Sequence, residues 1–214
     1  DIKGHFSIDT SFNSAEIGNS DPVNIVFTVA GESVTIPIVF VQPTVKVEKS
    51  GIYNGKDNTI EWTVKVNGDK ASIENAVLTD DIPIGQQYVE SPGAKISPDA
   101  TGSFGYDSTA DTTKTGTLTY TFGGIISDTY TITFKTKVTD AEIFKTEDKT
   151  TDVKNKAVLT YGSGKTVNSE ATVQVKTDFI SKEGYQVSND KTKIIWTITI
   201  NNNAQPITDA TVKD

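Results

Sequence analysis

The sequence predicts an all-β protein made of tandem sandwich modules, one complete and two partial. Apolar and polar residues alternate with a period of two in many short segments, which is typical of strands with one buried face. Clusters of Gly, Pro, Asn, Asp and Ser separate these segments, and no stretch has the periodicity of an ordinary helix. In addition, the chain repeats itself at a distance of about 134 residues, so it contains more than one copy of a module.

Residues 1–43 are expected to be the C-terminal strands of a preceding module. Alternation over residues 6–10, an apolar run over residues 23–29 and renewed alternation over residues 34–40 predict strands. Pro37 lies inside the last run and predicts an edge strand, because proline has no N–H to donate to a neighbouring strand. A complete sandwich usually needs about 100 residues, so this segment is too short to be one by itself.

Residues 44–177 are expected to form the complete module. Alternating segments lie at residues 60–66, 76–80, 118–122, 130–138, 155–161 and 171–175. The segment from Ser91 to Thr115 is rich in Gly, Ser, Pro, Asp and Thr and is predicted to form loops. The charged segment from Lys145 to Lys154 is predicted to be a loop or a short helix.

Residues 178–214 are expected to be the N-terminal strands of a following copy. The pattern Lys-x-Gly at residues 182–184 repeats the one at residues 49–51, and Trp196 repeats Trp62. The offset is 133 residues at the lysines and 134 residues at the tryptophans. Because the tryptophans recur at equivalent places, we interpret both as core residues and not as sugar-binding surfaces.

The composition excludes several classes of function. Only 35% of the 214 residues are hydrophobic, and no apolar run is long enough to span a membrane. The net charge of -8 disfavours binding to nucleic acid or to anionic membrane surfaces. Cysteine is absent, which excludes disulfides and thiolate metal sites, and no cofactor or metal is expected. Such a composition suits an extracellular or cell-surface β-protein.

Three polar residues fall on apolar faces of different predicted strands, namely Lys49, Asp80 and Asn155. Each has a simple structural explanation when taken alone. Lys49 can extend its ammonium group to solvent from a strand end, Asp80 can cap the turn before Pro83, and Asn155 can bind the backbone at a sheet edge. The combination of the three has a chemical explanation as well.

A lysine, a carboxylic acid and an asparagine together can form an intramolecular isopeptide bond. An apolar pocket favours the neutral, nucleophilic amine of Lys49 and the protonated carboxyl group of Asp80. The protonated acid can then hydrogen-bond the Asn155 carboxamide and transfer protons while the amine attacks and ammonia leaves. The product is a neutral amide, so the cost of burying a cation disappears.

Three motifs carry a family resemblance: EKSG at residues 48–51, IEWTVKVN at residues 60–67 and LTDDIP followed by GQQ at residues 78–87. They resemble the collagen-binding-domain family of Gram-positive surface adhesins. The resemblance extends from about Gly4 to Thr177, with the start of a further copy to Asp214. It implies Ig-like sandwich modules and, in the module 44–177, a lysine–asparagine isopeptide bond aided by an aspartate. The matching positions are Lys49, Asp80 as the proton-transferring acid, and Asn155 within VKNKA at residues 153–157.

The same resemblance implies the partners and the location of the protein. A host extracellular matrix protein such as collagen is the expected ligand, and neighbouring modules of the same chain are expected to pack against each other around it. The expected location is the extracellular, wall-anchored surface of a Gram-positive bacterium. The repeated segment offers a second, incomplete set, Lys182 and Asp214, with no asparagine partner after it.

Two other functions remain open at this point. The tandem repeat favours a structural stalk that binds no ligand of its own, and an accessory module of a secreted glycosidase is a third class. Catalysis on an external substrate is not expected, because the chain has no cysteine and a single histidine, His5. The spacing of Asp99, Asp107 and Asp111 fits no recognised calcium loop.

Overall fold

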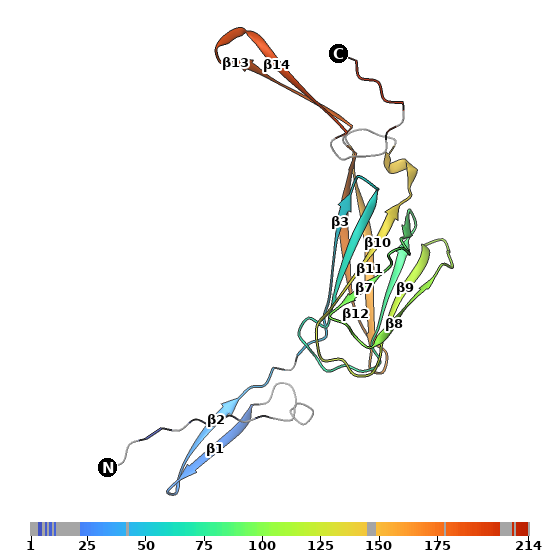
Figure 1. Cartoon of the computed structure of the whole chain (residues 1–214). Helices are drawn as coiled ribbons and strands as arrows, with labels where there is room; N and C mark the ends of the chain where they lie inside the picture. The colour runs from blue at the N-terminus through green and yellow to red at the C-terminus, as the bar shows by residue number, and fades with distance from the viewer. Residues whose placement is uncertain are drawn as a thin grey trace. The chain divides into compact units, whose positions relative to one another are not determined.

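The chain is almost entirely β-structure in the computed structural model (Figure 1). The structure describes residues 4, 5, 7, 9, 11, 22–41, 43–144, 149–177, 179–201, 207 and 209–213. Within this part of the chain, the only helical element is the short 3-10 turn η1 (Ala141–Phe144), and no helix is long and apolar enough to cross a membrane. The prediction of an all-β protein is therefore confirmed. Residues 6, 8 and 10, where the first strand was expected, lie outside the described residues.

The chain divides into two compact units, residues 1–44 and residues 45–214. The larger unit contains a sandwich of two antiparallel sheets (Figure 1). In spatial order, the strands of the first sheet are β3 (Val47–Asn54), β4 (Thr59–Val66), β10 (Tyr130–Val138) and β6 (Gln86–Tyr88), with β7 (Lys95–Ser97) also paired to β10. The strands of the second sheet are β12 (Lys165–Thr177), β11 (Lys149–Tyr161), β5 (Val77–Pro83), β9 (Lys114–Phe122) and β8 (Gly102–Asp107).

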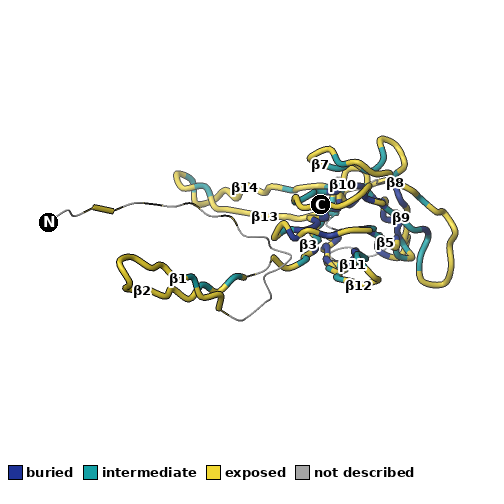
Figure 2. Tube along the Cα trace, turned by 90° about the horizontal axis from the view of Figure 1, so that it is seen from below, coloured by how far each residue is buried: buried dark blue, intermediate teal, exposed yellow. Residues whose placement is uncertain are grey.

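The core lies between these two sheets, where the alternation in the sequence places the apolar side chains (Figure 2). Every second residue of β4 faces inward and has no exposed surface: Ile60, Trp62, Val64 and Val66. The facing sheet contributes Leu78 and Ile82 from β5, Leu118 and Tyr120 from β9, and Ala157 and Leu159 from β11. Burial of these side chains supplies the main driving force for folding, about 1.5–3 kcal/mol for each large one.

Two segments differ from the sequence-based expectation. The segment 91–115, predicted as loops, contains β7, β8 and the start of β9. Strand β8 pairs only with β9, so turn-forming residues such as Gly105 are tolerated on its outer face, while Phe104 and Tyr106 pack against the core. Residues 149–154, predicted as a loop or a short helix, begin strand β11. Asp152 and Lys154 are exposed, while Val153 between them is buried.

Two hairpins flank the sandwich in the sequence. They are β1 (Val23–Val29) with β2 (Glu32–Ile38), and β13 (Ile180–Val187) with β14 (Asp190–Ile200), each a two-stranded sheet. Among the described residues, strand β2, which contains Pro37, pairs with β1 alone. The expectation of a core tryptophan is correct for Trp62, which is fully buried, and wrong for Trp196, which is 56% exposed. A two-stranded sheet has no second layer of its own to cover its apolar face.

The hairpin β13–β14 repeats the geometry of β3–β4. In β3–β4, Lys49 lies opposite Val64 and Gly51 lies opposite Trp62. In β13–β14 the equivalent lysine and glycine lie opposite Ile198 and Trp196. The pairing of β13 with β14 shifts register between Gln186 and Val187, in the interval where the repeat offset changes from 133 to 134 residues. The extra residue of the second copy is thus accommodated near the hairpin turn. The lysine and the tryptophan therefore keep the same cross-strand pairing as in the first copy.

Gly51 is required because the Trp62 indole occupies the space of a side chain. A Cβ atom at Gly51 would lie 2.6 Å from Trp62 Cε3 and 2.7 Å from Val173 Cγ2. We therefore expect Gly51→Ala to lower the free energy of unfolding by about 1–3 kcal/mol, measured by urea denaturation. Gly68→Ala is the matched control, since its Cβ would meet only the Lys65 side chain at 3.7 Å. Equal stability of the two variants would contradict this explanation.

Candidate functional site

The three polar residues singled out from the sequence all point into the sandwich core. Lys49 lies on β3 in one sheet, whereas Asp80 on β5 and Asn155 on β11 lie in the other. Strands β5 and β11 are neighbours, and Asp80 is opposite Ala157, so Asn155 is its diagonal neighbour on the same face. The backbone N–H of Lys49 donates to Ser169 Oγ of β12 at 3.0 Å, which joins β3 to the edge of the second sheet.

Lys49 and Asp80 form a buried pair. The Lys49 side chain has no exposed surface, the Asp80 side chain is 1% exposed, and Lys49 Nζ contacts Asp80 Oδ2 directly. The simpler explanations, in which Lys49 reaches solvent and Asp80 caps a turn, are therefore wrong. Charged side chains are almost never fully buried without a partner, so each of these two groups accounts for the burial of the other.

Two aromatic rings complete the surroundings of the lysine amine. Lys49 Nζ lies 5.0 Å from the centroid of the Trp62 ring and 4.7 Å from that of Phe134. Rings at this distance stabilise a cation through their π faces and also keep water away from it. Phe134 was not singled out from the sequence. Alternation predicts that it lies on the buried face of β10, but it does not show which residues of other strands it contacts.

The apolar surroundings favour the uncharged forms of the pair. Burial lowers the pKa of Lys49, against the attraction of the Asp80 carboxylate. Burial also raises the pKa of Asp80, against the opposite influence of Lys49 and Asn155. Transfer of one proton from the ammonium to the carboxylate leaves the total charge unchanged and removes both buried charges. Both shifts lie in the direction of a neutral amine in contact with a carboxylic acid.

Asn155 is buried beside this pair, with 2% of its surface exposed. Strand β11 lies between β12 and β5, so the explanation that Asn155 bonds the backbone at a sheet edge is wrong. Its carboxamide is close enough to lower the pKa of Asp80. However, Asn155 Oδ1, Asn155 Nδ2 and Asp80 Oδ1 form no hydrogen bond of normal geometry with any of the described residues. Each such buried atom costs about 1–3 kcal/mol, so this cluster is not explained by stability.

Of the second, incomplete set of candidate residues, the structure describes the lysine alone. Lys182 on β13 places its Nζ 4.9 Å from the Trp196 ring, as in the first copy, and Asp214 lies outside the described residues. His5 is exposed. The part of the chain that the structure describes contains no group of three His, Cys, Asp or Glu residues placed to hold a metal ion.

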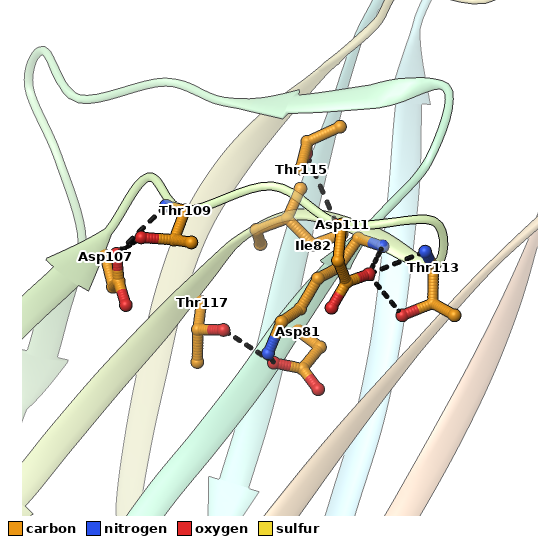
Figure 3. A network of polar contacts seen from close by, with 9 residues as sticks. Asp81, Ile82, Asp107, Thr109, Asp111, Thr113, Thr115 and Thr117 are labelled. Atoms are coloured by element: carbon orange, nitrogen blue, oxygen red, sulfur yellow. Dashed lines mark hydrogen bonds and ion pairs between the residues drawn. The ribbon is translucent and has the colours of Figure 1, made fainter.

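Asp107 at the end of β8 and Asp111 in the following loop each accept hydrogen bonds from a threonine two residues further on (Figure 3). Asp107 Oδ1 accepts hydrogen bonds from the backbone N–H and the hydroxyl of Thr109, at 2.9 and 2.6 Å. Asp111 Oδ1 does the same with Thr113, at 2.6 and 2.7 Å. These contacts lower the pKa of both carboxyl groups and stabilise the turns. The loop carboxylates are thus explained by local structure.

In a comparison with known families, residues 44–178 match the family described as collagen binding domain. This range contains the strands of the two-sheet sandwich, from β3 to β12, and with them Lys49, Asp80 and Asn155. It also covers more than half of the chain. None of the curated proteins compared matches the sequence.

Several solved structures are similar to the chain. The collagen-binding domain of a Staphylococcus aureus adhesin is 18% identical, with a TM-score of 0.41, and the match covers 63% of this chain and 99% of that domain. The collagen-binding subdomain of the Enterococcus faecalis surface protein ACE is 15% identical, with a TM-score of 0.39 and coverage of 64% and 99%. The collagen-binding domain of the Erysipelothrix rhusiopathiae surface protein RspB is 15% identical, with a TM-score of 0.41 and coverage of 77% and 62%. Assignment to a family depends on the sequence match over residues 44–178.

Removal of the lysine is expected to make stability depend on pH through Asp80. In Lys49→Met the carboxyl group stays buried without its cation, so its folded-state pKa lies above the unfolded value of about 3.9. The folded state then binds more protons than the unfolded state. The free energy of unfolding is therefore expected to fall as pH rises from about 4 through the folded pKa, by up to about 1.4 kcal/mol per pH unit.

Urea denaturation between about pH 4 and pH 7 measures this dependence. The double variant Lys49→Met/Asp80→Asn is the control, since it keeps the same lysine replacement but lacks the titrating group. The difference between the two profiles isolates Asp80 from the other carboxyl groups of the chain. Parallel profiles for the single and double variants would show that Asp80 keeps an ordinary pKa.

Proposed function

This chain belongs to the collagen-binding domain family, and we propose that it is part of a surface adhesin that binds collagen with a covalently locked sandwich. The match of the family over the whole sandwich carries this proposal. It is a family of binding domains, so no reaction on an external substrate is expected. An extracellular location at the surface of a Gram-positive bacterium follows from the same assignment, and we extend the proposal to anchoring in the cell wall.

We further propose that residues 44–177 are one complete module, that residues 1–43 end a preceding module and that residues 178–214 begin a following one. The repeated hairpin supports the last boundary, because β13–β14 has the same lysine, glycine and tryptophan arrangement as β3–β4. On this proposal, Lys182 and Asp214 belong to the second copy of the site.

The proposed lock is an amide bond between Lys49 Nζ and Asn155 Cγ. The neutral amine attacks Cγ, the Cγ–Nδ2 bond breaks, and Nδ2 leaves as ammonia. Asp80 gives its proton to the leaving nitrogen and takes one from the attacking nitrogen, so it is a protonated acid again at the end. No oxidant, cofactor or metal is needed, since the atoms and charges balance within the three side chains.

The unsatisfied polar atoms around Asp80 support this reaction. Before it, an amine and a carboxyl group are buried, and Asn155 Oδ1, Asn155 Nδ2 and Asp80 Oδ1 make no hydrogen bond of normal geometry with the described residues. After it, Nδ2 has left, the amine has become an amide, and the carboxylic acid of Asp80 can donate to Asn155 Oδ1. The reaction thus removes the cost of three unpaired atoms and replaces a basic amine by an amide that carries no charge.

The bond closes a loop from residue 49 to residue 155. In a simple chain-entropy treatment, a cross-link closing about 100 residues stabilises the folded state by about 4–5 kcal/mol. It also joins β3 to β11, so that tension on the chain passes through the bond and bypasses the residues between them. Both effects suit a protein that holds a ligand outside the cell without disulfides.

The intact mass of the purified chain tests the bond. We expect a mass about 17 Da below the calculated value, because amide formation releases ammonia. Asn155→Ala and Asp80→Ala are expected to have unshifted masses, since they remove the electrophile and the proton-transferring acid. The control Asn168→Ala removes an exposed asparagine on β12 and is expected to keep the loss. An unshifted mass in the unmutated chain would reject the bond.

For the ligand contact, we propose the outer face of the second sheet. A shallow groove of about 420 Å³ lies on this face, and its lining includes Thr79, Val158, Lys156 and Lys154. Across the strands, Val158 is opposite Thr79, Thr79 is opposite Thr119, and Thr119 is opposite Gly105. This row of small side chains leaves a flat surface with hydroxyl groups along it.

Such a surface suits a collagen triple helix. Its chains are extended and rod-like, with Gly at every third position and solvated backbone groups along the outside, so recognition needs hydrogen bonds along a shallow track more than a deep pocket. At the rim of the groove, the Asp81 carboxylate accepts hydrogen bonds from Lys114 and Thr117 at 3.0 and 2.7 Å (Figure 3). This rim therefore keeps a fixed shape.

A substitution that fills the groove tests the contact. Val158→Arg places a long charged side chain on the groove floor and is expected to weaken binding to immobilised collagen by about tenfold or more, equivalent to about 1.4 kcal/mol. Thr63→Arg is the matched control, because Thr63 is a partly exposed position on the outer face of the first sheet. Unchanged binding by Val158→Arg, with the control also unchanged, would place the ligand elsewhere.

A structural stalk is the second candidate function. The repeated hairpin β13–β14 favours it, because tandem copies of one locked module build a spacer. The two functions differ in a solid-phase assay with collagen and other matrix proteins. An adhesin module binds at least one of them in saturable fashion, whereas a stalk module shows the 17 Da loss and binds none.

A further inference from the structure

We propose that Gln86 and Thr136 are positioning residues for the reaction between Lys49 and Asn155. The inference rests on the bond proposed above and adds two residues that do not touch the reacting atoms in any described contact. Both are buried, with 2% of Gln86 and none of Thr136 exposed. Buried amide and hydroxyl groups in a sandwich core are costly unless they are paired, so their partners are informative.

A chain of hydrogen bonds runs through these residues from one sheet to the other. Trp62 Nε1 on β4 donates to Thr136 Oγ1 on β10 at 2.8 Å. Thr136 Oγ1 donates to Gln86 Oε1 on β6 at 2.7 Å. Gln86 Nε2 then donates to the backbone carbonyl of Lys154 on β11 at 3.2 Å. We call these three side chains, Trp62, Thr136 and Gln86, the core relay.

The direction of the core relay is fixed by its first member. An indole N–H only donates, so the Thr136 hydroxyl accepts from Trp62 and must use its own hydrogen toward Gln86. The Gln86 oxygen is thereby the acceptor, and its NH₂ group is the end that faces Lys154. The carboxamide of Gln86 can make both contacts in one orientation only, so the relay has a single arrangement.

The two ends of the core relay lie next to the two reacting groups. At one end, the Trp62 ring stands 5.0 Å from Lys49 Nζ and fills the space beside Gly51. At the other end, the carbonyl of Lys154 immediately precedes Asn155. Thr115 Oγ1 donates to the backbone carbonyl of Gln86 at 2.7 Å, which also holds β6 against the second sheet.

This placement matters because the nucleophile and the electrophile belong to different sheets. Reaction requires the amine and the carboxamide carbon to approach within about 3–3.5 Å along the right direction, and a misplacement of about 1 Å can slow a reaction by about 100-fold. Apolar contacts between sheets are not directional. The core relay is directional, because each of its hydrogen bonds has a preferred angle. It therefore fixes the position of the Trp62 ring, beside Lys49, relative to strand β11, which carries Asn155.

The substitution Thr136→Val tests the proposal, because it keeps the shape and removes the hydroxyl. Timed cell-free synthesis, quenched in acid and followed by intact-mass spectrometry, measures how fast the 17 Da loss accumulates. We expect the loss to accumulate about tenfold or more slowly in Thr136→Val. We expect a rate close to that of the unmutated chain in Thr136→Ser, which restores the hydroxyl, and in Thr133→Val, a partly exposed threonine on the same strand.

A second measurement separates positioning from folding. In the Asn155→Ala background no bond forms, so circular dichroism and hydrogen exchange of the Trp62 indole N–H report the folded fraction and the relay alone. Thr136→Val in this background is expected to stay folded while the indole proton exchanges faster. The proposal is overturned if folded Thr136→Val loses ammonia as fast as the unmutated chain. It is also overturned if the loss is slower only because a smaller fraction of Thr136→Val is folded.

The failure of the bond itself gives a different pattern. If the unmutated chain shows no mass loss while its indole proton is protected, the proposed bond is rejected and the core relay is only a structural network. That result overturns the positioning role as well, and the two failures are distinguished by the mass of the unmutated chain.

Discussion

The contact between Lys49 and Asp80 is the constraint on which the rest of the sandwich depends. An amine and a carboxyl group are placed where the alternation of β3 and β5 requires apolar side chains, between two sheets of aliphatic and aromatic residues. Replacing such a pair with hydrophobic residues often leaves the stability of a protein unchanged or increases it. Stability alone therefore does not explain why the pair is present. Together with the buried Asn155 carboxamide beside it, the pair supports the proposed reaction among these three side chains.

The sequence identified this site because period-two alternation assigns each residue to a face. Lys49, Asp80 and Asn155 stood out as polar residues on apolar faces, and the structure places all three in the core. The same rule failed where its assumptions do not hold. Strand β8 is an edge strand with turn-forming residues on its outer face, and the start of β11 carries its charges outward, so neither segment looked like a strand.

Other features could not be predicted from the sequence, because they depend on contacts between residues that are far apart in the chain. Trp196 follows the same pattern as Trp62, yet it is exposed on a two-stranded sheet, since burial requires a second layer that local pattern does not report. Gln86 and Thr136 lie 50 residues apart and meet in the core through one hydrogen bond. A glutamine beside a turn and a threonine in an alternating strand have no distinguishing signal in a single sequence.

The order in which the chain is synthesised gives the repeated hairpin a further meaning. The arrangement of lysine, glycine and tryptophan in β3–β4 recurs in β13–β14, where none of the other described strands is paired with the hairpin, so it needs only local contacts. Asn155 leaves the ribosome roughly 100 residues after Lys49, which is about 5–20 s at ordinary rates of translation. The Trp62 ring and Gly51 beside the amine are therefore synthesised first, and in the proposed reaction the Asn155 carboxamide follows with β11, before β12 adds the edge strand of the second sheet.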